Sequence, residues 1–327
     1  MTFNKRQLLV SAGICALTLT TVHSALAQTW PQRPIKMIVT APPGGTADYL
    51  ARVVADRMGK QLNQSVIIDN RAGASGMLGA DLVAKAAPDG YTLLLTEGAS
   101  LAINTTLRKD LPFNPTRDLL PVSLLATTPS ILVAGTAFPA SNVKELVGMA
   151  KQGPGAVSYA TPGVGTPHHL AGAMLSKMAG IQMNHVPYKG GGAVITDVVS
   201  GQVPLLFTGV LGPLPFLKSG KLKAIAIGSR QRSPQLPDVP TFAESGYPDF
   251  EAEVFFGAFL PAKVPQNVVD VMSSAINAAM ADPDVRKKLG EQALSAVGST
   301  PQQLESHFAK ETAKWAGVIK SSGVTLE

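Results

Sequence analysis

The stretch Ala160–Gly180, ATPGVGTPHHLAGAMLSKMAG, comes nearest to a chemical motif in this chain. A phosphate loop would need a lysine after the glycines, and the dinucleotide fingerprint G-x-G-x-x-G would need glycine where His168 stands. The adjacent His168 and His169 point to different sides of a helix, so they cannot share one metal ion. An acyl-transfer motif H-H-x-x-x-D would need aspartate where Ala173 stands. The stretch therefore predicts no catalytic residue, no metal site and no cofactor.

The same stretch fits an anion-binding helix N-terminus. Thr166 is a good N-cap, and Pro167 suits the first helical position. Gly163 and Gly165 let the backbone bend so that its N–H groups face outward. A helix start carries about half a positive charge and several unpaired donors, which suits a carboxylate. The alternative is that the glycines only form a tight turn between a strand and a helix.

A second loop of this kind, Ala41–Asp48 (APPGGTAD), follows the strand expected at 35–40. Both loops come at the carboxyl end of a strand and before a helix, where ligands bind in open α/β sheets. Two such helix starts facing each other across a cleft would hold an anion from both sides. Neither loop supplies an obvious general base or nucleophile, which favours binding without chemistry.

Short apolar runs alternate with helical patterns along the chain, which is typical of a parallel α/β sheet. We expect strands at 35–40, 66–68, 91–96, 119–126, 131–134, 157–160, 185–188, 203–207 and 223–227, with Thr127–Pro129 as a break between two of them. Helices are expected at 46–61, 166–178, 193–200, 268–280, 284–292 and 301–319. The last helix has Thr300 as N-cap and Gln303 three residues later. Its apolar face predicts docking on a core through Leu304, Phe308, Trp315 and Ile319.

Composition and the N-terminus limit the function further. Residues 1–27 combine Lys5 and Arg6, a short apolar run and a small-x-small site at Ala25–Ala27, which predicts a cleaved secretory signal peptide. Cleavage would remove the sole cysteine, and with it any disulfide or thiolate site. The net charge of +6 would fall to +4, without a basic stripe or interleaved aromatic residues, so nucleic-acid binding is not expected.

Several blocks in a fixed order resemble the Bug-type periplasmic solute-binding receptors of tripartite tricarboxylate transporters, from about Trp30 to the C-terminus. They are APPGGTAD (41–48), IIDNRAGASGMLGADLVAKAAPDGYTLL (67–94), LPFNPTRDLLPVSLLATTP (111–129), SYATPGVGTPHHL (158–170), HVPYKGGGAVITDVVSGQV (185–203), RSPQLPDVPTFAESGYPDF (232–250) and ETAKW (311–315). The resemblance implies a type II periplasmic-binding-protein fold, with two α/β domains that close on a ligand. We expect domain 1 at 28–126 and 253–327, and domain 2 at 127–252.

The resemblance also implies that backbone N–H groups and ordered waters from loops of both domains hold the ligand carboxylate. The corresponding residues here are Thr46, Ala47, Asp48, Ser75, Thr161, Gly163, Gly165, Thr166, His168, Tyr188 and Lys189. Three alternatives stay open: Asp48 as a helix-capping residue, His168 as a local hydrogen-bond partner, and Lys189 as a solvated surface lysine. The chain departs from the family at the far end of the pocket. Pro204 and Thr208 stand where aspartates are frequent, and Phe255 stands where a tryptophan is common near the second hinge.

These observations predict a monomeric periplasmic binding protein, not an enzyme, that delivers a small carboxylate to membrane permease subunits. Loss of both acidic positions removes partners for an amine, so we expect an aromatic, dicarboxylic or tricarboxylic acid rather than an amino acid. Phe255 and Tyr188 would supply an apolar wall, and Thr208 lines the same end. The alternatives are a ligand-loaded sensor, or an enzyme that uses Asp48 or His168 as its acid–base residue.

Overall fold

The computed structural model describes residues 30–326, so the expected signal peptide lies outside the described residues. The compact unit that begins at Arg33 is described below. Its ten strands form one hydrogen-bonded sheet, in which eight strands follow the order β2-β1-β3-β9-β4-β7-β5-β6 and β10 and β8 pair with β4 off this path. The strands are β1 Ile35–Val39, β2 Val66–Asn70, β3 Thr92–Glu97, β4 Leu119–Gly135, β5 Ser158–Thr161, β6 Asn184–Pro187, β7 Leu205–Gly209, β8 Leu222–Ile227, β9 Glu253–Pro261 and β10 Ser295–Ala296.

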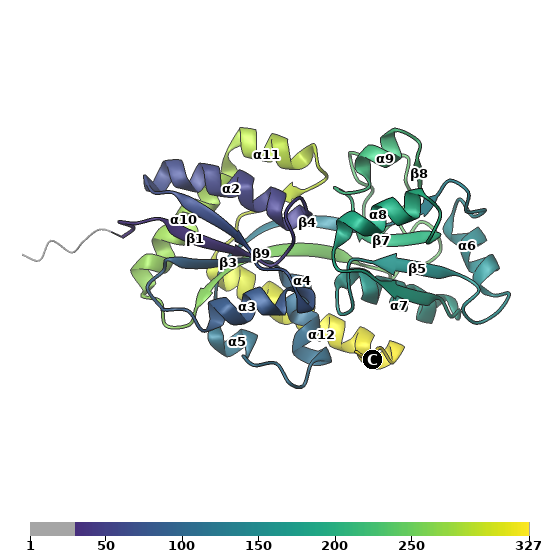
Figure 1. Cartoon of the computed structure of the whole chain (residues 1–327), viewed down its shortest axis with the longest axis horizontal. Helices are drawn as coiled ribbons and strands as arrows, with labels where there is room; N and C mark the ends of the chain where they lie inside the picture. The colour runs from purple at the N-terminus through teal and green to yellow at the C-terminus, as the bar shows by residue number, and fades with distance from the viewer. Residues whose placement is uncertain (1–29, 327) are drawn as a thin grey trace, which may run out of the picture. The chain divides into compact units, whose positions relative to one another are not determined.

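The first sheet region consists of β1, β2, β3, β9, β10 and the first part of β4. Strand β1 pairs in parallel with β2 and β3, and β9 closes on β3 in the antiparallel sense. Because β1 has neighbours on both edges and helices on both faces, Ile35, Met37, Ile38 and Val39 are all buried. Figure 1 shows α2, α10 and α11 on one face and α3, α4, α5 and α12 on the other. Their bounds are α2 Thr46–Leu62, η1 Ala74–Gly76, α3 Met77–Ala84, α4 Gly98–Leu107, α5 Pro115–Asp118, α10 Gln266–Ala281, α11 Pro283–Gly290 and α12 Pro301–Ser322.

The second sheet region consists of β5, β6, β7, β8 and the last part of β4. Strand β5 pairs in parallel with β6 and β7, and β4 pairs antiparallel with β7 and β8. Buried residues of α8 and α9 pack on one face, and those of α6 and α7 on the other (Figure 1). These helices are α6 Val143–Ala150, α7 Pro167–Ala179, α8 Gly191–Val199 and α9 Leu214–Lys218.

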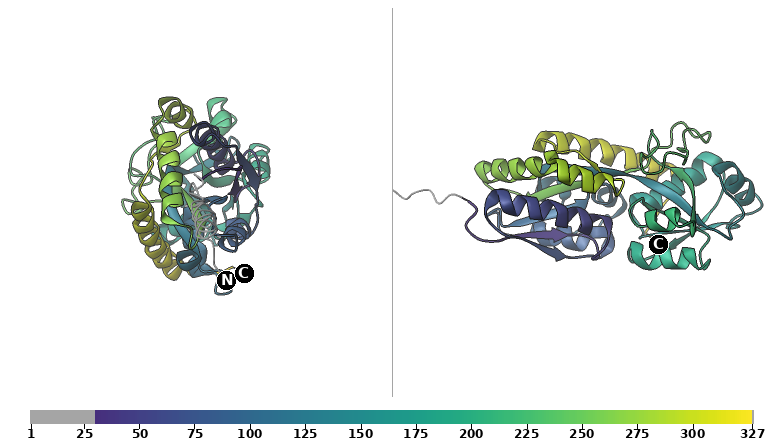
Figure 2. Two further views of the ribbon diagram at one scale, coloured as in Figure 1. Left: turned by 90° about the vertical axis from the view of Figure 1, so that its left-hand side faces the viewer. Right: turned by 90° about the horizontal axis from the view of Figure 1, so that it is seen from above.

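The expected break at Thr127–Pro129 is wrong, because β4 is one strand that passes from the first region into the second. Up to Pro129, β4 pairs with β9, and from Ser130 onward it pairs with β7. A proline lacks an N–H donor, and here it stands where the strand changes partners, so it interrupts neither ladder. The courses of β4 and β9 can also be followed in Figure 2. The division into domains at 126/127 and 252/253 stays a prediction, since Arg33 onward clusters as one unit.

The C-terminal helix α12 confirms the predicted cap and buried face. Thr300 and Gln303 form a capping box, and Leu304, Phe308 and Trp315 are buried. The helix contacts α4 and β4 as well as α7. It therefore joins the two regions alongside β4 and β9.

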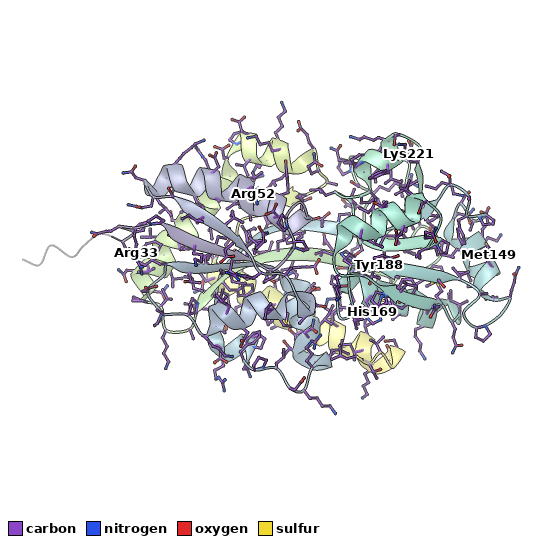
Figure 3. The ribbon with its side chains drawn as sticks, viewed as in Figure 1. Arg33, Arg52, Met149, His169, Tyr188 and Lys221 are labelled. Carbon is purple, nitrogen blue, oxygen red and sulfur yellow. The ribbon has the colours of Figure 1, made fainter. Side chains whose placement is uncertain are left out.

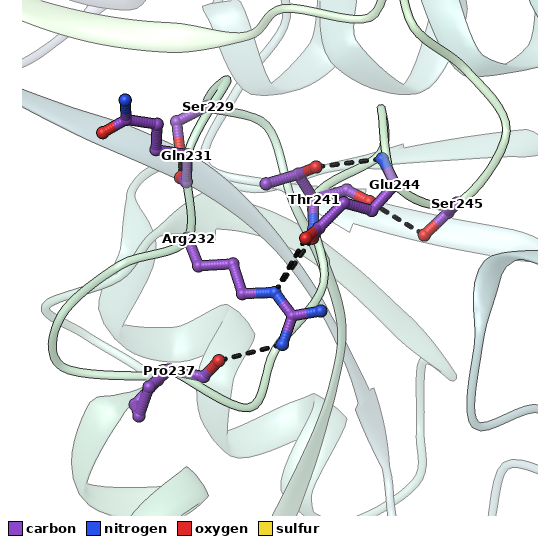
Figure 4. A network of polar contacts seen from close by, with 7 residues as sticks. All are labelled: Ser229, Gln231, Arg232, Pro237, Thr241, Glu244 and Ser245. Atoms are coloured by element: carbon purple, nitrogen blue, oxygen red, sulfur yellow. Dashed lines mark hydrogen bonds and ion pairs between the residues drawn. The ribbon is translucent and has the colours of Figure 1, made fainter.

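The segment 228–252 between β8 and β9 is ordered by a polar network (Figure 4). The Nε of Arg232 donates to both carboxylate oxygens of Glu244, at 3.1 and 3.0 Å, and its Nη1 donates to the carbonyl of Pro237 at 3.0 Å. Glu244 also accepts the N–H of Thr241 at 2.7 Å. The block RSPQLPDVPTFAESGYPDF thus shapes the path that leads back into β9.

Candidate carboxylate-binding loops

The loop that precedes α7 has the predicted helix-start geometry. Thr166 is the N-cap and accepts the N–H of His169 at 3.3 Å, and Pro167 occupies the first turn. Gly165 has a φ of +72°, a conformation that other residues rarely adopt. The hydroxyls of Thr161 and Thr166 both donate to the carbonyl of Gly163, at 3.2 and 2.8 Å. These bonds fix the loop from within.

The corresponding loop before α2 differs at its N-cap. Its N-cap is Gly45, and no side chain in the described part of the chain caps the first turn of the helix. Thr46 is partly exposed there, whereas Ala47 and Asp48 are buried. The first helical N–H groups of α2 therefore lack the side-chain partner that Thr166 provides at α7.

The carboxylate of Asp48 stabilises its own loop through hydrogen bonds. Its carboxylate accepts the N–H of Gly44 at 3.0 Å, two bonds from the guanidinium of Arg52 at 2.9 and 3.0 Å, and the amide of Asn70 at 3.0 Å. Burial alone would raise the pKa of Asp48, but the bonds from Arg52, Gly44 and Asn70 outweigh it and hold the pKa below its ordinary value. Asp48 thus lies in the first turn of α2 but bonds to Gly44 rather than to a helical N–H, so it holds the loop and does not cap the helix.

Ser75 lies in a strained loop that reaches the second region. The φ angles of Gly73, Ala74, Ser75 and Gly76 are +133°, +48°, +55° and +90°. For the two residues that are not glycine, this conformation costs about 1–2 kcal/mol each. The Ser75 hydroxyl donates to the carbonyl of Val164, within the loop before α7.

Further contacts bring the loops of the two regions together. The side-chain amide of Asn104, on α4, donates to the carbonyl of Gly165 at 2.9 Å. A Cβ on Gly190 would lie 3.1 Å from Pro42, and a Cβ on Gly209 would lie 3.7 Å from the hydroxyl of Thr46. Asn104 is fully buried and was not predicted from the sequence, because no motif surrounds it.

His168 lies in a buried polar cluster. Its Nδ1 lies 3.0 Å from the hydroxyl of Ser130, and its Nε2 lies 3.7 Å from Oε1 of Glu97, the last residue of β3. Burial lowers the pKa of His168 to about 3 and raises the pKa of Glu97 to about 7, although a hydrogen bond from Ser100 opposes the latter. His168 makes a structural hydrogen bond, but its partner is Ser130 on β4 and not a group within its own turn. Glu97 is an acidic group near the loops that the sequence argument missed.

The remaining predicted residues differ in their positions. Tyr188 donates its hydroxyl to Asp197 at 2.6 Å, and its carbonyl would lie 3.5 Å from a Cβ on Gly163. Thr208 is buried in β7, next to the residue that faces Thr46, whereas Lys189 is exposed. Phe255 is only 1% exposed, and its ring fills the space beside Gly98. The structure thus brings Ser75 to the loop 161–166 and Thr46 to Gly209, and it leaves Lys189 exposed.

Within residues 30–326, no helix is both long and apolar enough to cross a bilayer. Over the same range, no group of three or more His, Cys, Asp or Glu side chains is arranged to hold a metal ion.

Comparison with known proteins gives matches along nearly the whole chain. The model of the family described as "Tripartite tricarboxylate transporter family receptor" matches residues 50–324. Protein BugT of Bordetella pertussis is 36% identical over 325 residues, which cover 99% of this chain and 100% of that protein. R. palustris Rpa4515, solved with adipate, gives a TM-score of 0.87 at 31% identity and covers 90% of this chain and 99% of its own. MatC from Rhodopseudomonas palustris, solved with bound malate, gives 0.83 at 30% identity and covers 89% and 100%. Periplasmic binding proteins are among the solved matches, which confirms the predicted fold class.

Proposed function

We propose that this chain, which belongs to the receptor family of tripartite tricarboxylate transporters, captures a small carboxylate in the periplasm. It would deliver this ligand to membrane permease subunits. Capture would take place between the predicted domains, 28–126 with 253–327 and 127–252, as they close on the ligand. The receptor would act as a monomer, a point that light scattering on the purified protein can test.

The observation that carries this proposal is that each region places a helix N-terminus beside residues of the other region. The loop before α7 contacts Ser75 and Asn104 of the first region, and Gly209 on β7 faces Thr46 at the start of α2. Each helix start therefore presents partial positive charge where the two regions meet. A carboxylate held there would meet backbone donors from both regions, including those of α2 that no side chain caps.

For the ligand, we propose a dicarboxylate without an amine. The support is that Pro204 and Thr208 offer no acidic partner for an ammonium group, and that structures of two relatives hold adipate and malate. Glu97 is the acidic group that argues the other way, because an ionised carboxylate near the loops would favour an amine. Malate carries a hydroxyl group where aspartate carries an ammonium group, so a comparison of the two acids separates the two possibilities.

Binding without turnover is favoured over catalysis by the state of the two candidate acid–base residues. The carboxylate of Asp48 is held by Gly44, Arg52 and Asn70. The pKa of His168 is lowered to about 3 by burial, so its ring is uncharged at neutral pH and does not act as a cationic general acid. A role as a ligand-loaded sensor would use the same binding site, and co-purification with membrane proteins can distinguish it from delivery.

A thermal-shift panel tests the proposal directly. Adipate, malate, succinate, citrate, benzoate, aspartate and glutamate would be compared at pH 7.5 and at graded concentrations. A ligand at one hundred times its Kd adds roughly 2.7 kcal/mol to the free energy of unfolding. We expect stabilisation by a dicarboxylate, with the compound recovered unchanged by mass spectrometry. Tighter binding of aspartate than of malate would refute the ligand class, and conversion of the bound compound would refute binding without turnover.

A further inference from the structure

Two histidines that sequence reasoning did not select lie directly behind the loop before α7, and one of them, His169, is labelled in Figure 3. His169 on α7 and His185 on β6 stack with their ring centroids 4.0 Å apart and their planes 17° from parallel. Nδ1 of His169 accepts the N–H of Gly165 at 3.3 Å. Nε2 of His185 lies 2.7 Å from the hydroxyl of Thr161. The pair therefore touches both ends of the loop 161–165.

The hydrogen bond to Gly165 requires neutral His169. A backbone N–H can only donate, so Nδ1 must be unprotonated and the ring proton must be on Nε2. Thr161 already donates its hydroxyl proton to the carbonyl of Gly163, so Nε2–H of His185 is the donor toward Thr161. Protonation of His169 would replace an acceptor by a donor, facing the Gly165 N–H. Protonation of both rings would put two cations 4.0 Å apart.

Nothing around the pair compensates a positive charge. A hollow of about 650 Å³ gives solvent a route to the two rings, and its titratable lining residues are Tyr159, His169, Lys177 and His185. Tyr159, on β5, packs against His185 and donates its hydroxyl to the carbonyl of His169 at 3.3 Å. Lys177 adds a cation from α7, and the segment at the end of α12 contributes only Ser322 and Val324. No carboxylate is among the described residues that line this hollow.

We propose that His169 and His185 are positioning residues that hold the loop 161–166 in its binding form only while both rings are neutral, so that the affinity for a carboxylate falls as the pH drops. This inference rests on the proposed function, because it takes the loop as part of the binding site.

The direction of the effect follows from the electrostatics. Burial lowers the pKa of His169 to about 4, and burial together with repulsion from His169 lowers the pKa of His185 to about 3. Both values lie below 6.5, the ordinary value for histidine, so the ordered loop is fully stabilised above pH 6.5 and loses stabilisation as the pH falls from 6.5 toward 4. Each histidine can change the equilibrium between the ordered and the disordered loop by at most about tenfold per pH unit. Glu97 cannot imitate this effect, because its pKa is raised and its contribution has the opposite sign.

The decisive variant is the double substitution His169→Asn with His185→Gln. Asn places an amide oxygen where Nδ1 accepts from Gly165, and Gln places an amide N–H toward Thr161, and neither side chain titrates. The matched control is His307→Gln on α12, since His307 is another histidine whose pKa is lowered by burial, but it contacts Phe255 rather than the loop.

Two measurements at pH 7.5 and 5.5 test the inference. Hydrogen exchange of the peptide spanning residues 160–170, corrected for intrinsic rates, follows the loop without any ligand. Calorimetric titration with adipate and with malate follows binding. We expect exchange protection and affinity to fall at pH 5.5 by at least about tenfold more in the wild type and in His307→Gln than in the double variant, in which His168 alone of the three histidines at the loop still titrates, after the ligand's own titration is subtracted.

The two measurements separate the possible failures. Equal protection of the loop at both pH values in the wild type would overturn the positioning role, and so would a double variant that loses protection as the wild type does. If the loop behaves as expected but neither adipate nor malate, nor any acid of the panel, binds at either pH, the positioning role stands and the proposed function fails.

Discussion

The replacement of Gly165 by alanine tests whether the loop before α7 is built for contact with the first region. Alanine at a φ of +72° costs about 1 kcal/mol in backbone strain. Its Cβ would also lie 2.9 Å from Oδ1 of Asn104 and 3.3 Å from Leu107, so Asn104 must move and its hydrogen bond to the Gly165 carbonyl is lost. That bond contributes roughly 1 kcal/mol. Gly155 has the same φ of +72° but nothing within 4 Å of a Cβ, so Gly155→Ala carries the backbone cost alone.

We expect Gly155→Ala to lose about 1 kcal/mol of folding stability and Gly165→Ala about 2 kcal/mol, which lowers Tm by roughly 2 °C and roughly 4 °C for a chain of this size. Calorimetry with adipate or malate should separate them. The extra cost of about 1 kcal/mol falls on the state in which the loops meet, so Gly165→Ala should weaken binding about fivefold or more relative to Gly155→Ala. Equal affinities for the two variants would mean that contact between the loop and Asn104 has no part in binding, and the carboxylate would have to be sought elsewhere.

Three further predictions concern the groups around the loops. Thr166→Ala should lower the free energy of unfolding by about 1 kcal/mol through the lost cap and also weaken binding, whereas Thr300→Ala, at the cap of α12, should lower stability similarly and leave calorimetric affinity unchanged. Asp48→Asn should lower the free energy of unfolding by roughly 2 kcal/mol at pH 7. Because the pKa of Asp48 is lowered, its contribution to the wild type is lost as the pH falls below the ordinary value of 3.8, so the difference between the two proteins should disappear in acid melts. A constant difference down to pH 2 would contradict this. Glu97→Gln should be more stable than the wild type by roughly 2 kcal/mol above pH 7, and the two proteins should be equally stable below pH 4.5. The reason is that the raised pKa of Glu97 makes the wild type lose stability as the pH rises. Parallel curves of Tm against pH would refute the assigned burial effect.

Local signals predicted most of the elements, and the failures have different causes. Caps and periodicity located α7 and α12 to within a few residues. Helix α4 was not predicted, because Gly98–Asn104 are all buried and the segment has no polar face to produce a helical period. The false break in β4 came from reading Pro129 as the end of a strand. Whether a proline ends a strand or only stands where it changes partners depends on the neighbouring strands, which local sequence does not specify.

The candidate site was predictable where its chemistry is local. The glycines and the cap before α7 have their roles within a few residues of one another, and they were found. Asn104 meets Gly165 from 61 residues away, and His185 meets Thr161 from 24 residues away, so no local pattern indicates either contact. The role of Asp48 did have a local signal, since Arg52 stands four residues later on the same helix and pairs with it.

The two helix starts differ in a way that bears on how a ligand could couple the regions. At α7 the N-cap hydroxyl, the glycine turn and the bond from Gly165 to His169 satisfy the loop internally. At α2 no described side chain caps the first turn, and Asp48 is turned away toward Arg52 and Asn70. An anion bound between the two helix starts would therefore accept hydrogen bonds from the first turn of α2, which lacks a cap. It would also contact the loop before α7, which is already formed. If one carboxylate meets both starts, it would supply the missing cap of α2, and ligand binding would stabilise the contact of the two regions by that interaction.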